Sequence, residues 1–158
     1  MSKFLIIDTR EKPNKIEHIT KTFDAAGITY ERSKLLFGDY MDWNRPEIVI
    51  DRKQNIGELA KNVTTDYKRF VAELDRALAA GSQLVILVEQ NRYKYNGQWK
   101  RVETIADLMV WSNPHSSIQG EKVFRVLSAL INRYNISVQF CDKRQTGREI
   151  LKIIYGIQ

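Results

Sequence analysis

The sequence is poor in cysteine and histidine, and it contains no long apolar run. Its 158 residues include one cysteine, Cys141, and two histidines, His18 and His115. A single cysteine excludes an internal disulfide and, by itself, a cysteine-based zinc site. The N-terminal run MSKFLIID is too short for a signal peptide, and no segment approaches the ~20 apolar residues that a membrane span needs. We therefore expect a cytoplasmic protein without a membrane partner.

Internal repeats, low-complexity tracts and linkers are also missing. A chain of this length has the usual size of one compact domain and can bury a substantial core. Lys and Arg number 25 against 19 Asp and Glu, which gives a net charge of +6. This excess favours a polyanionic partner such as nucleic acid, although many basic proteins bind nothing acidic. We predict a single domain over residues 1–158.

Apolar patterning predicts strands that alternate with helices. Strands are expected over 3–8, 28–35, 39–43, 47–51, 83–89 and 136–140, and helices over 16–26, 56–63, 66–81, 102–111, 120–134 and 146–156. In the helix over 66–81, Phe70, Leu74 and Leu78 form the apolar stripe. An Asn-Gly pair within RYKYNGQWKR (92–101) predicts a tight hairpin. The alternation is typical of an α/β domain with a mixed central sheet flanked by helices.

The stretch VIDRK (49–53) ends an apolar strand in one acid and two bases, with no turn residue between them. Because side chains alternate along a strand, Asp51 and Lys53 share one face and Arg52 lies on the other. Asp39 stands at the start of the preceding strand. If strands 40–43 and 47–51 pair as an antiparallel hairpin, Asp39 lies beside Asp51. Two carboxylates and an ammonium would then converge on one spot.

Such a cluster suggests a bound cation. Two like charges at close range are costly unless a cation lies between them. Hard oxygen ligands suit Mg²⁺ or Mn²⁺, and a metal held in this way can activate water and neutralise charge on a phosphoryl group. Lys53 would orient that water or stabilise the developing charge. The residues leave open the alternative that Asp51 and Lys53 are an ordinary ion pair at a solvated strand end.

Four short motifs occur in the order and approximate spacing of the XPF-type nuclease domain: IIDTRE (6–11), GDY (38–40), IDRK (50–53) and LVILVE (84–89). The chain resembles this family over about residues 3–90, with a weaker likeness to small phage or prophage members through TGREIL. The resemblance implies a restriction-endonuclease-like core. We expect two additions to that core. They are the hairpin, over 91–102, and a C-terminal helix–strand–helix extension, over 103–158.

The resemblance also implies roles for individual side chains. The implied metal ligands are Asp8, Asp39 and Asp51, and the implied catalytic residues are Glu11, Asp39, Asp51 and Lys53. Asp8 and Glu11 match the family's N-terminal acidic pair, which lines the same cleft. Arg52 matches the family's central arginine, in a structural or phosphate-facing role.

Two positions depart from the family pattern. Asp51 stands where the family usually has Glu, which keeps the charge but shortens the side chain. Gly57 occupies the place of the family's final Asp, and Glu58, one position later, is a candidate replacement. Nothing matches the family's helix-hairpin-helix module. The grip on DNA is therefore expected from this domain, from a homodimer or from a separate DNA-binding partner protein.

Basic residues near aromatic ones mark possible DNA contacts. The hairpin combines its basic residues with Tyr93, Tyr95 and Trp99, which could stack on unpaired bases. The alternative is an edge hairpin that lysines protect from aggregation. The candidate DNA contacts on the helices that follow Asp51, Arg52 and Lys53 (the charged triplet) are Lys61, Lys68 and Arg69. Those on the hairpin are Arg92, Lys94, Lys100 and Arg101.

Together these features predict an Mg²⁺- or Mn²⁺-dependent DNA endonuclease that acts on branched, flapped or junction DNA in recombination or repair. Its setting would be a bacterial or phage-infected cell. Two alternatives stay open at this point. One is a non-catalytic DNA-binding or scaffold protein on a degenerate nuclease fold, and the other is a dimeric Holliday-junction resolvase or restriction-type enzyme.

Overall fold

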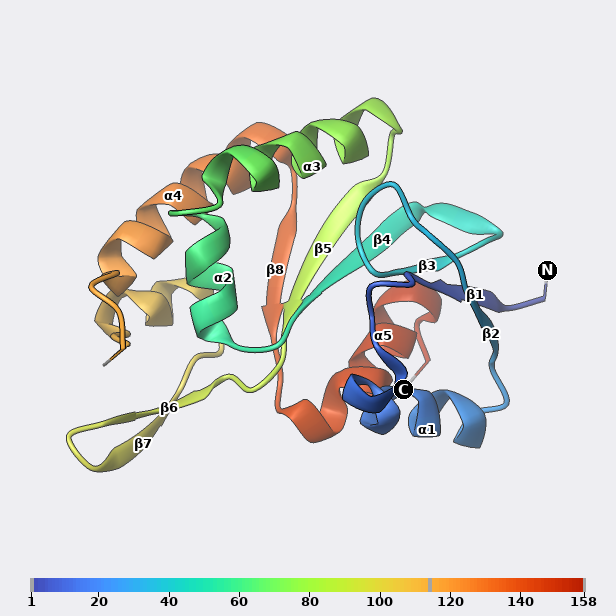
Figure 1. Ribbon diagram of the computed structural model, residues 1–158, viewed down its shortest axis with the longest axis horizontal. Coiled ribbons are helices and arrows are strands. Elements are labelled where there is room, and N and C mark those ends of the chain that lie inside the picture. Colours follow the sequence, from blue (N-terminus) through green and yellow to red (C-terminus); the bar gives the residue numbers. More distant parts are fainter. Residues whose placement is uncertain (1, 114, 158) are drawn as a thin grey trace.

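The computed structural model describes residues 2–113 and 115–157, and within them a six-stranded mixed sheet forms the centre (Figure 1). The strands lie in the order β2-β1-β3-β4-β5-β8. Their bounds are β1 (Phe4–Ile7), β2 (Thr29–Arg32), β3 (Tyr40–Asp42), β4 (Arg45–Lys53), β5 (Gln83–Val88) and β8 (Ser137–Phe140). β3 is antiparallel to both neighbours, and the other pairs are parallel. The predicted mixed sheet is thus confirmed.

Helices cover both faces of this sheet. They are α1 (Glu17–Ala25), α2 (Ile56–Asn62), α3 (Tyr67–Ala79), α4 (Gly120–Tyr134) and α5 (Thr146–Tyr155). Apolar residues of α2, α3 and α4 form one core cluster, and those of α1 and α5 form the other. The central strand β5 contributes alternate residues to the two clusters, as its unbroken apolar sequence predicts. Figure 1 shows the two groups of helices apart, with β4 and β5 between them.

Two expectations about helices are wrong. The segment expected as a helix over 102–111 forms only a 3₁₀ turn, Ile105–Val110. Thr104 and Asp107 make the capping box that starts it. The residues that pack into the core here, Val102, Ile105, Leu108 and Trp111, recur every three positions, which matches the 3₁₀ repeat rather than the α-helical one. In α3, Ala77 is buried whereas Leu78 is 58% exposed, because the stripe through Phe70 and Leu74 continues on the Ala77 side.

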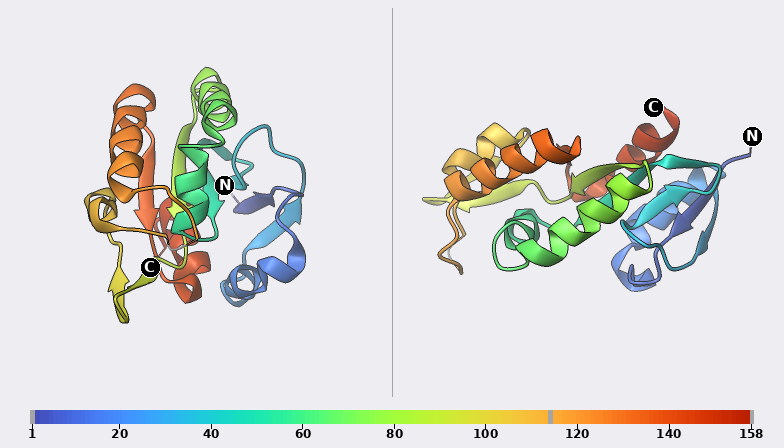
Figure 2. Two further views of the ribbon diagram at one scale, coloured as in Figure 1. Left: turned by 60° about the vertical axis from the view of Figure 1, so that its left-hand side comes forward. Right: turned by 90° about the horizontal axis from the view of Figure 1, so that it is seen from above.

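The predicted hairpin is confirmed as a separate two-stranded sheet of β6 (Arg92–Tyr95) and β7 (Gln98–Arg101). Asn96 and Gly97 both have positive φ, 50° and 76°, which the tight turn requires. The hairpin starts just after β5 and extends beyond the rest of the molecule in every view (Figures 1 and 2). Among the described residues, no helix is long and apolar enough to cross a membrane.

Candidate active site

The VIDRK stretch forms the end of β4, and β3 lies antiparallel beside it. Tyr40 pairs with Ile50, so the residues that flank this pair, Asp39 and Asp51, face each other across the two strands. The backbone N–H of Asp39 donates to the Ile50 carbonyl at 2.7 Å. One Asp39 carboxylate oxygen accepts from the Arg52 backbone N–H at 2.8 Å. The predicted hairpin therefore brings Asp39 to Asp51.

These two acids line a cleft of about 450 Å³. Its floor is the end of β4, and one wall is made by α2 and α3. Charged residues dominate its lining, namely Arg10, Glu11, Asp39, Asp51, Arg52, Lys53, Glu58, Lys61, Asp66, Arg69, Glu73 and Arg76. Such a mixture of both signs suits a charged ligand better than an apolar one.

Asp51 and Lys53 both point into this cleft from the same face of β4. Lys53 Nζ lies 3.1 Å from Asp51 Oδ2, and 5.7 Å from the centre of the Phe70 ring. Lys53 is only 7% exposed. Burial opposes its charge, but the carboxylates of Asp51 and Asp39 outweigh burial and raise the pKa of Lys53. The amine therefore stays an ammonium at neutral pH.

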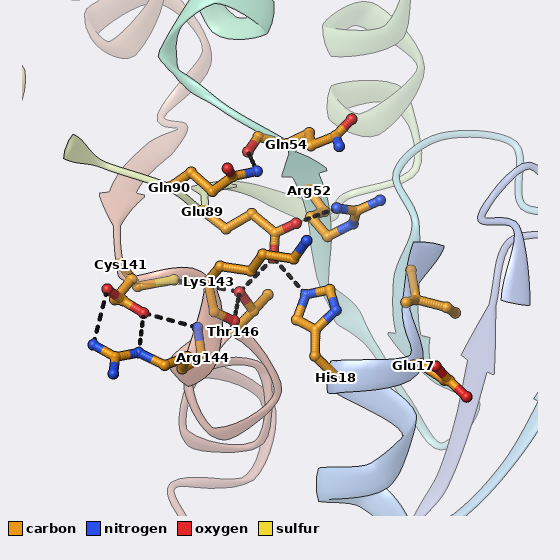
Figure 3. Close-up of polar contacts among 12 residues, drawn as sticks. Glu17, His18, Arg52, Gln54, Glu89, Gln90, Cys141, Lys143, Arg144 and Thr146 are labelled. Carbon is orange, nitrogen blue, oxygen red and sulfur yellow. Dashed lines mark hydrogen bonds and ion pairs between the residues drawn. The ribbon is translucent and has the colours of Figure 1, made fainter. Parts of the chain in front are cut away.

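Arg52 points to the opposite face of β4, where its charge is fully paired. Its Nε and Nη2 donate to the two carboxylate oxygens of Glu11 at 2.6 and 2.8 Å, and its Nη1 donates to Glu89 at 2.5 Å. Glu89 in turn bonds to His18 of α1 and Thr146 of α5 (Figure 3). Arg52 thus ties β4 to β5, to both helices of that face and to the loop after β1. This geometry fits the structural role expected for it.

The two members of the N-terminal acidic pair lie in different surroundings. Glu11 lines the cleft, but both of its oxygens are bonded to Arg52. Asp8 is fully buried and is not part of the cleft lining. Its oxygens accept from Arg10 and from the Leu35 backbone N–H, and these bonds outweigh burial and lower the pKa of Asp8. Asp8 holds the loops beside the cleft, and its assignment as a metal ligand stays a prediction.

Sequence reasoning missed Glu73. This residue of α3 lines the cleft, and its Oε2 accepts from the Gly38 backbone N–H at 3.2 Å. Burial and the neighbouring Asp51 raise the pKa of Glu73 to about 7. On a helical wheel Glu73 lies only about 60° from Phe70, at the edge of the buried stripe. This position is the one feature of the sequence that could have indicated a role in the site. An acid at the border of a buried helix face lies close to the sheet rather than in open solvent.

Gly57, at the place of the family's final Asp, is followed by an acid that reaches the cleft. A side chain at Gly57 would start 3.4 Å from the Asn113 amide nitrogen, so the position borders another segment. Glu58, the next residue, lines the cleft and accepts from the Gln54 backbone N–H at 3.3 Å. An acid is therefore present at this end of α2, one position later than in the family pattern.

Three of the predicted DNA contacts follow the triplet on α2 and α3. Lys61 and Arg69 line the cleft, and Arg69 is paired with Asp66 at 3.0 Å. Lys68 is exposed but lies outside the lining. The four hairpin residues, Arg92, Lys94, Lys100 and Arg101, are all exposed.

The site is compatible with a divalent cation, although none of the described residues form a ready cluster of three or more His, Cys, Asp or Glu side chains for a metal. Burial and the charge of Asp51 raise the pKa of Asp39 well above its usual value. Asp51 Oδ2 is buried, and Lys53 is near it but not aligned as a hydrogen-bond donor, so within the described chain this oxygen accepts no hydrogen bond. Mg²⁺ is commonly held by one or two carboxylates and several waters, which these two acids can provide.

Comparison with known proteins shows the family and the fold of this chain. Residues 7–154 match the ERCC4 domain. XPF from Aeropyrum pernix has a similar fold, with a TM-score of 0.62 and 18% identity over 93% of this chain. The same protein in complex with DNA gives 0.66 and 16% over 96%. The chain spans about three fifths of those structures, 61% and 62%. No curated protein matches the sequence. The chain belongs to the ERCC4 domain family, the family of XPF-type nuclease domains.

Proposed function

We propose that this protein is an Mg²⁺- or Mn²⁺-dependent DNA endonuclease that hydrolyses phosphodiester bonds. One observation carries the proposal: Asp39, Asp51 and Lys53 meet in a charged cleft at the end of β4. Membership of the ERCC4 domain family supports the same activity. The three residues are all chemically competent for it.

Each residue has a distinct task in this proposal. Asp39 and Asp51 would hold the cation, which when bound supplies a Lewis acid for the phosphoryl group and an acidified water. Lys53 keeps its proton because its pKa is raised, so it acts as a hydrogen-bond donor and positive charge rather than as a base. It would orient the attacking water or stabilise negative charge on the phosphate. Glu73 holds the backbone of Gly38, next to Asp39, and thereby fixes one ligand.

The proposed substrate is branched or single-strand-containing DNA, met in recombination or repair. The net charge of +6 supports a polyanionic substrate, and Lys61 and Arg69 beside the carboxylates could bind phosphates. A homodimer or a separate DNA-binding protein would extend the grip on DNA.

The test is cleavage of a labelled panel of flap, fork, four-way junction, duplex and single-stranded DNA. Each substrate is incubated with Mg²⁺, Mn²⁺ or EDTA. We expect metal-dependent cutting of at least one branched substrate, and none in EDTA. Binding without cutting in either metal would support instead a DNA-binding protein on a degenerate nuclease fold. Symmetric cutting of the four-way junction would support a resolvase.

A further inference from the structure

A second hollow lies outside the cleft, where the hairpin leaves the sheet. Its volume is about 450 Å³. The start of the hairpin and the turn after β8 form its two walls, and the lining residues used below are Gln90, Arg92, Trp99, Asp142, Lys143 and Arg144. The Cys141 backbone N–H donates to Val88 at 2.9 Å, and the Asn91 N–H donates to Cys141 at 3.3 Å. The two walls are therefore fixed to each other by the backbone.

This hollow carries an excess of positive charge. Arg92, Lys143 and Arg144 stand against one carboxylate, Asp142, which is paired with Arg144 at 3.0 Å. Within the described residues, neither Arg92 nor Lys143 has an acidic partner within 4.0 Å, and both are exposed. Figure 3 shows Lys143 and Arg144 in the turn after Cys141, with Gln90 on the neighbouring strand end. Two free cations at one hollow favour an anionic ligand.

An exposed indole lies beside these charges. Trp99 is 62% exposed and lies on the hairpin face that also carries Arg92, Lys94 and Arg101. The Arg92 guanidinium lies 5.2 Å from the centre of the indole ring, and Lys94 Nζ lies 5.6 Å from it. A planar ring among cations matches a nucleotide, whose base stacks and whose phosphate pairs. In a duplex the bases are already stacked on each other, so only an unpaired base is free to contact the ring.

The hollow is connected to the end of the catalytic strand. Gln90 lines it, and Gln90 Nε2 donates to the carbonyl of Gln54, the residue after Lys53, at 2.9 Å. Gln90 also has a φ of 56°, a left-handed conformation that is uncommon for a residue other than glycine. This conformation turns the chain out of β5 into the hairpin. Gln54 and Gln90 therefore link the end of the strand that carries Asp51 and Lys53 to this hollow.

We propose that this hollow binds an unpaired stretch of DNA, with a base stacked on Trp99 and phosphates bound by Arg92 and Lys143. The inference rests on the proposed function and gives the place where the single-stranded segment of its substrate is bound. The hairpin then has a role in recognition, and the turn Asp142–Arg144 supplies half of the site.

The test is the affinity for a fluorescein-labelled 12-residue oligothymidylate, measured by anisotropy in EDTA so that nothing is cut. Trp99→Ala should weaken binding about 5- to 150-fold, the range expected for one lost base–aromatic stack, and Trp99→Phe should weaken it less. Trp43→Ala is the matched control, because Trp43 is 66% exposed and lies in the turn between β3 and β4, at the opposite end of β4 from Lys53. It should bind as wild type does.

The charges are tested separately on the same oligonucleotide. The double variant Arg92→Gln, Lys143→Gln should lower the slope of log affinity against log salt by about 1.4, since each phosphate contact on a single strand contributes about 0.7. Lys21→Gln, on the exposed side of α1, should leave the slope unchanged. Lys143 lies outside the hairpin, so this result does not depend on how the hairpin tolerates Trp99→Ala.

The outcomes separate this inference from the proposed activity. Binding that is lost in the Trp99 and charge variants supports the hollow, even if wild type cuts no substrate. Wild-type affinity in Trp99→Ala, or an equal loss on a matching duplex, overturns it while leaving cleavage a separate question. Tighter binding of oligouridylate than of oligothymidylate would overturn DNA as the ligand.

Discussion

Three consecutive residues of β4 show that charged side chains have different surroundings on the two faces of one strand. The Arg52 guanidinium lies between Glu11 and Glu89, and each of its three nitrogens donates to a carboxylate oxygen. Asp51 and Lys53, on the other face, lie beside further acids, and Asp51 Oδ2 accepts no hydrogen bond in the described chain. The first arrangement holds segments together. The second gathers several acids around one ammonium, which costs stability and is expected where a ligand binds.

The largest expected effect is the loss of stability when the ion pairs of Arg52 are removed. Arg52→Ala leaves Glu11 and Glu89 buried without their cation, so the free energy of unfolding should fall by roughly 3–5 kcal/mol. Chemical denaturation measures this. The matched control is Arg144→Ala, which breaks an exposed pair with Asp142 and should change the stability far less. Equal losses in the two variants would mean that the network adds nothing beyond a surface ion pair.

The next effect comes from removing the charge of Asp51, and it should change the cleavage rate rather than the stability. Asp51→Asn keeps the shape but removes one anion, so single-turnover cleavage should slow roughly a hundredfold or more, about 3 kcal/mol of transition-state free energy. Asp39 and Glu73 remain beside Lys53, so circular dichroism should show an unchanged fold. Asp51→Glu, which restores the family's usual acid, should stay active. An Asp51→Asn protein that cuts at the wild-type rate would remove Asp51 from the active site.

Much of this contrast could be predicted from the sequence. Strand periodicity alone assigns Asp51 and Lys53 to one face and Arg52 to the other, and the short connection between β3 and β4 brings Asp39 across. The network that Arg52 forms with Glu89 and its partners was not predictable in the same way. Glu11, Glu89, His18 and Thr146 come from four separate segments, and only the sheet order joins them.

Glu73 and the second hollow show where sequence reasoning stops. Glu73 is one of several charged residues on α3, and its burial depends on the angle at which α3 lies over β4. The hollow requires that β8 pair in parallel with β5, which places Lys143 beside the hairpin. Neither the helix angle nor the strand order leaves a periodic signal in the chain.

A smaller effect is the pH dependence of stability that Glu73 causes on the cleft face of β4. Its pKa of about 7 in the folded protein lies above its ordinary value of 4.5, so the folded state binds the proton more tightly. Without metal, the free energy of unfolding should therefore fall as pH rises from about 5 to 8, by roughly 1–3 kcal/mol. Glu73→Gln should flatten this change, because the amide cannot ionise. A wild-type protein equally stable in EDTA at both pH values would contradict it.

The smallest effect is the stabilisation expected when a divalent cation binds to the carboxylates on this face of β4. A ligand at ten times its dissociation constant adds about 1.4 kcal/mol to the free energy of unfolding, so Mg²⁺ or Mn²⁺ should raise the melting temperature of wild type. Asp39→Asn should lose most of this rise, whereas Glu121→Gln, an exposed acid on α4, should keep it. The gain should also be larger at pH 8 than at pH 6, since at the lower pH the proton on Glu73 already relieves part of the repulsion. Differential scanning fluorimetry of the three proteins at both pH values measures this. A melting temperature that ignores millimolar divalent metal would mean that Lys53 alone balances the carboxylates, and the two faces of β4 would then both be structural.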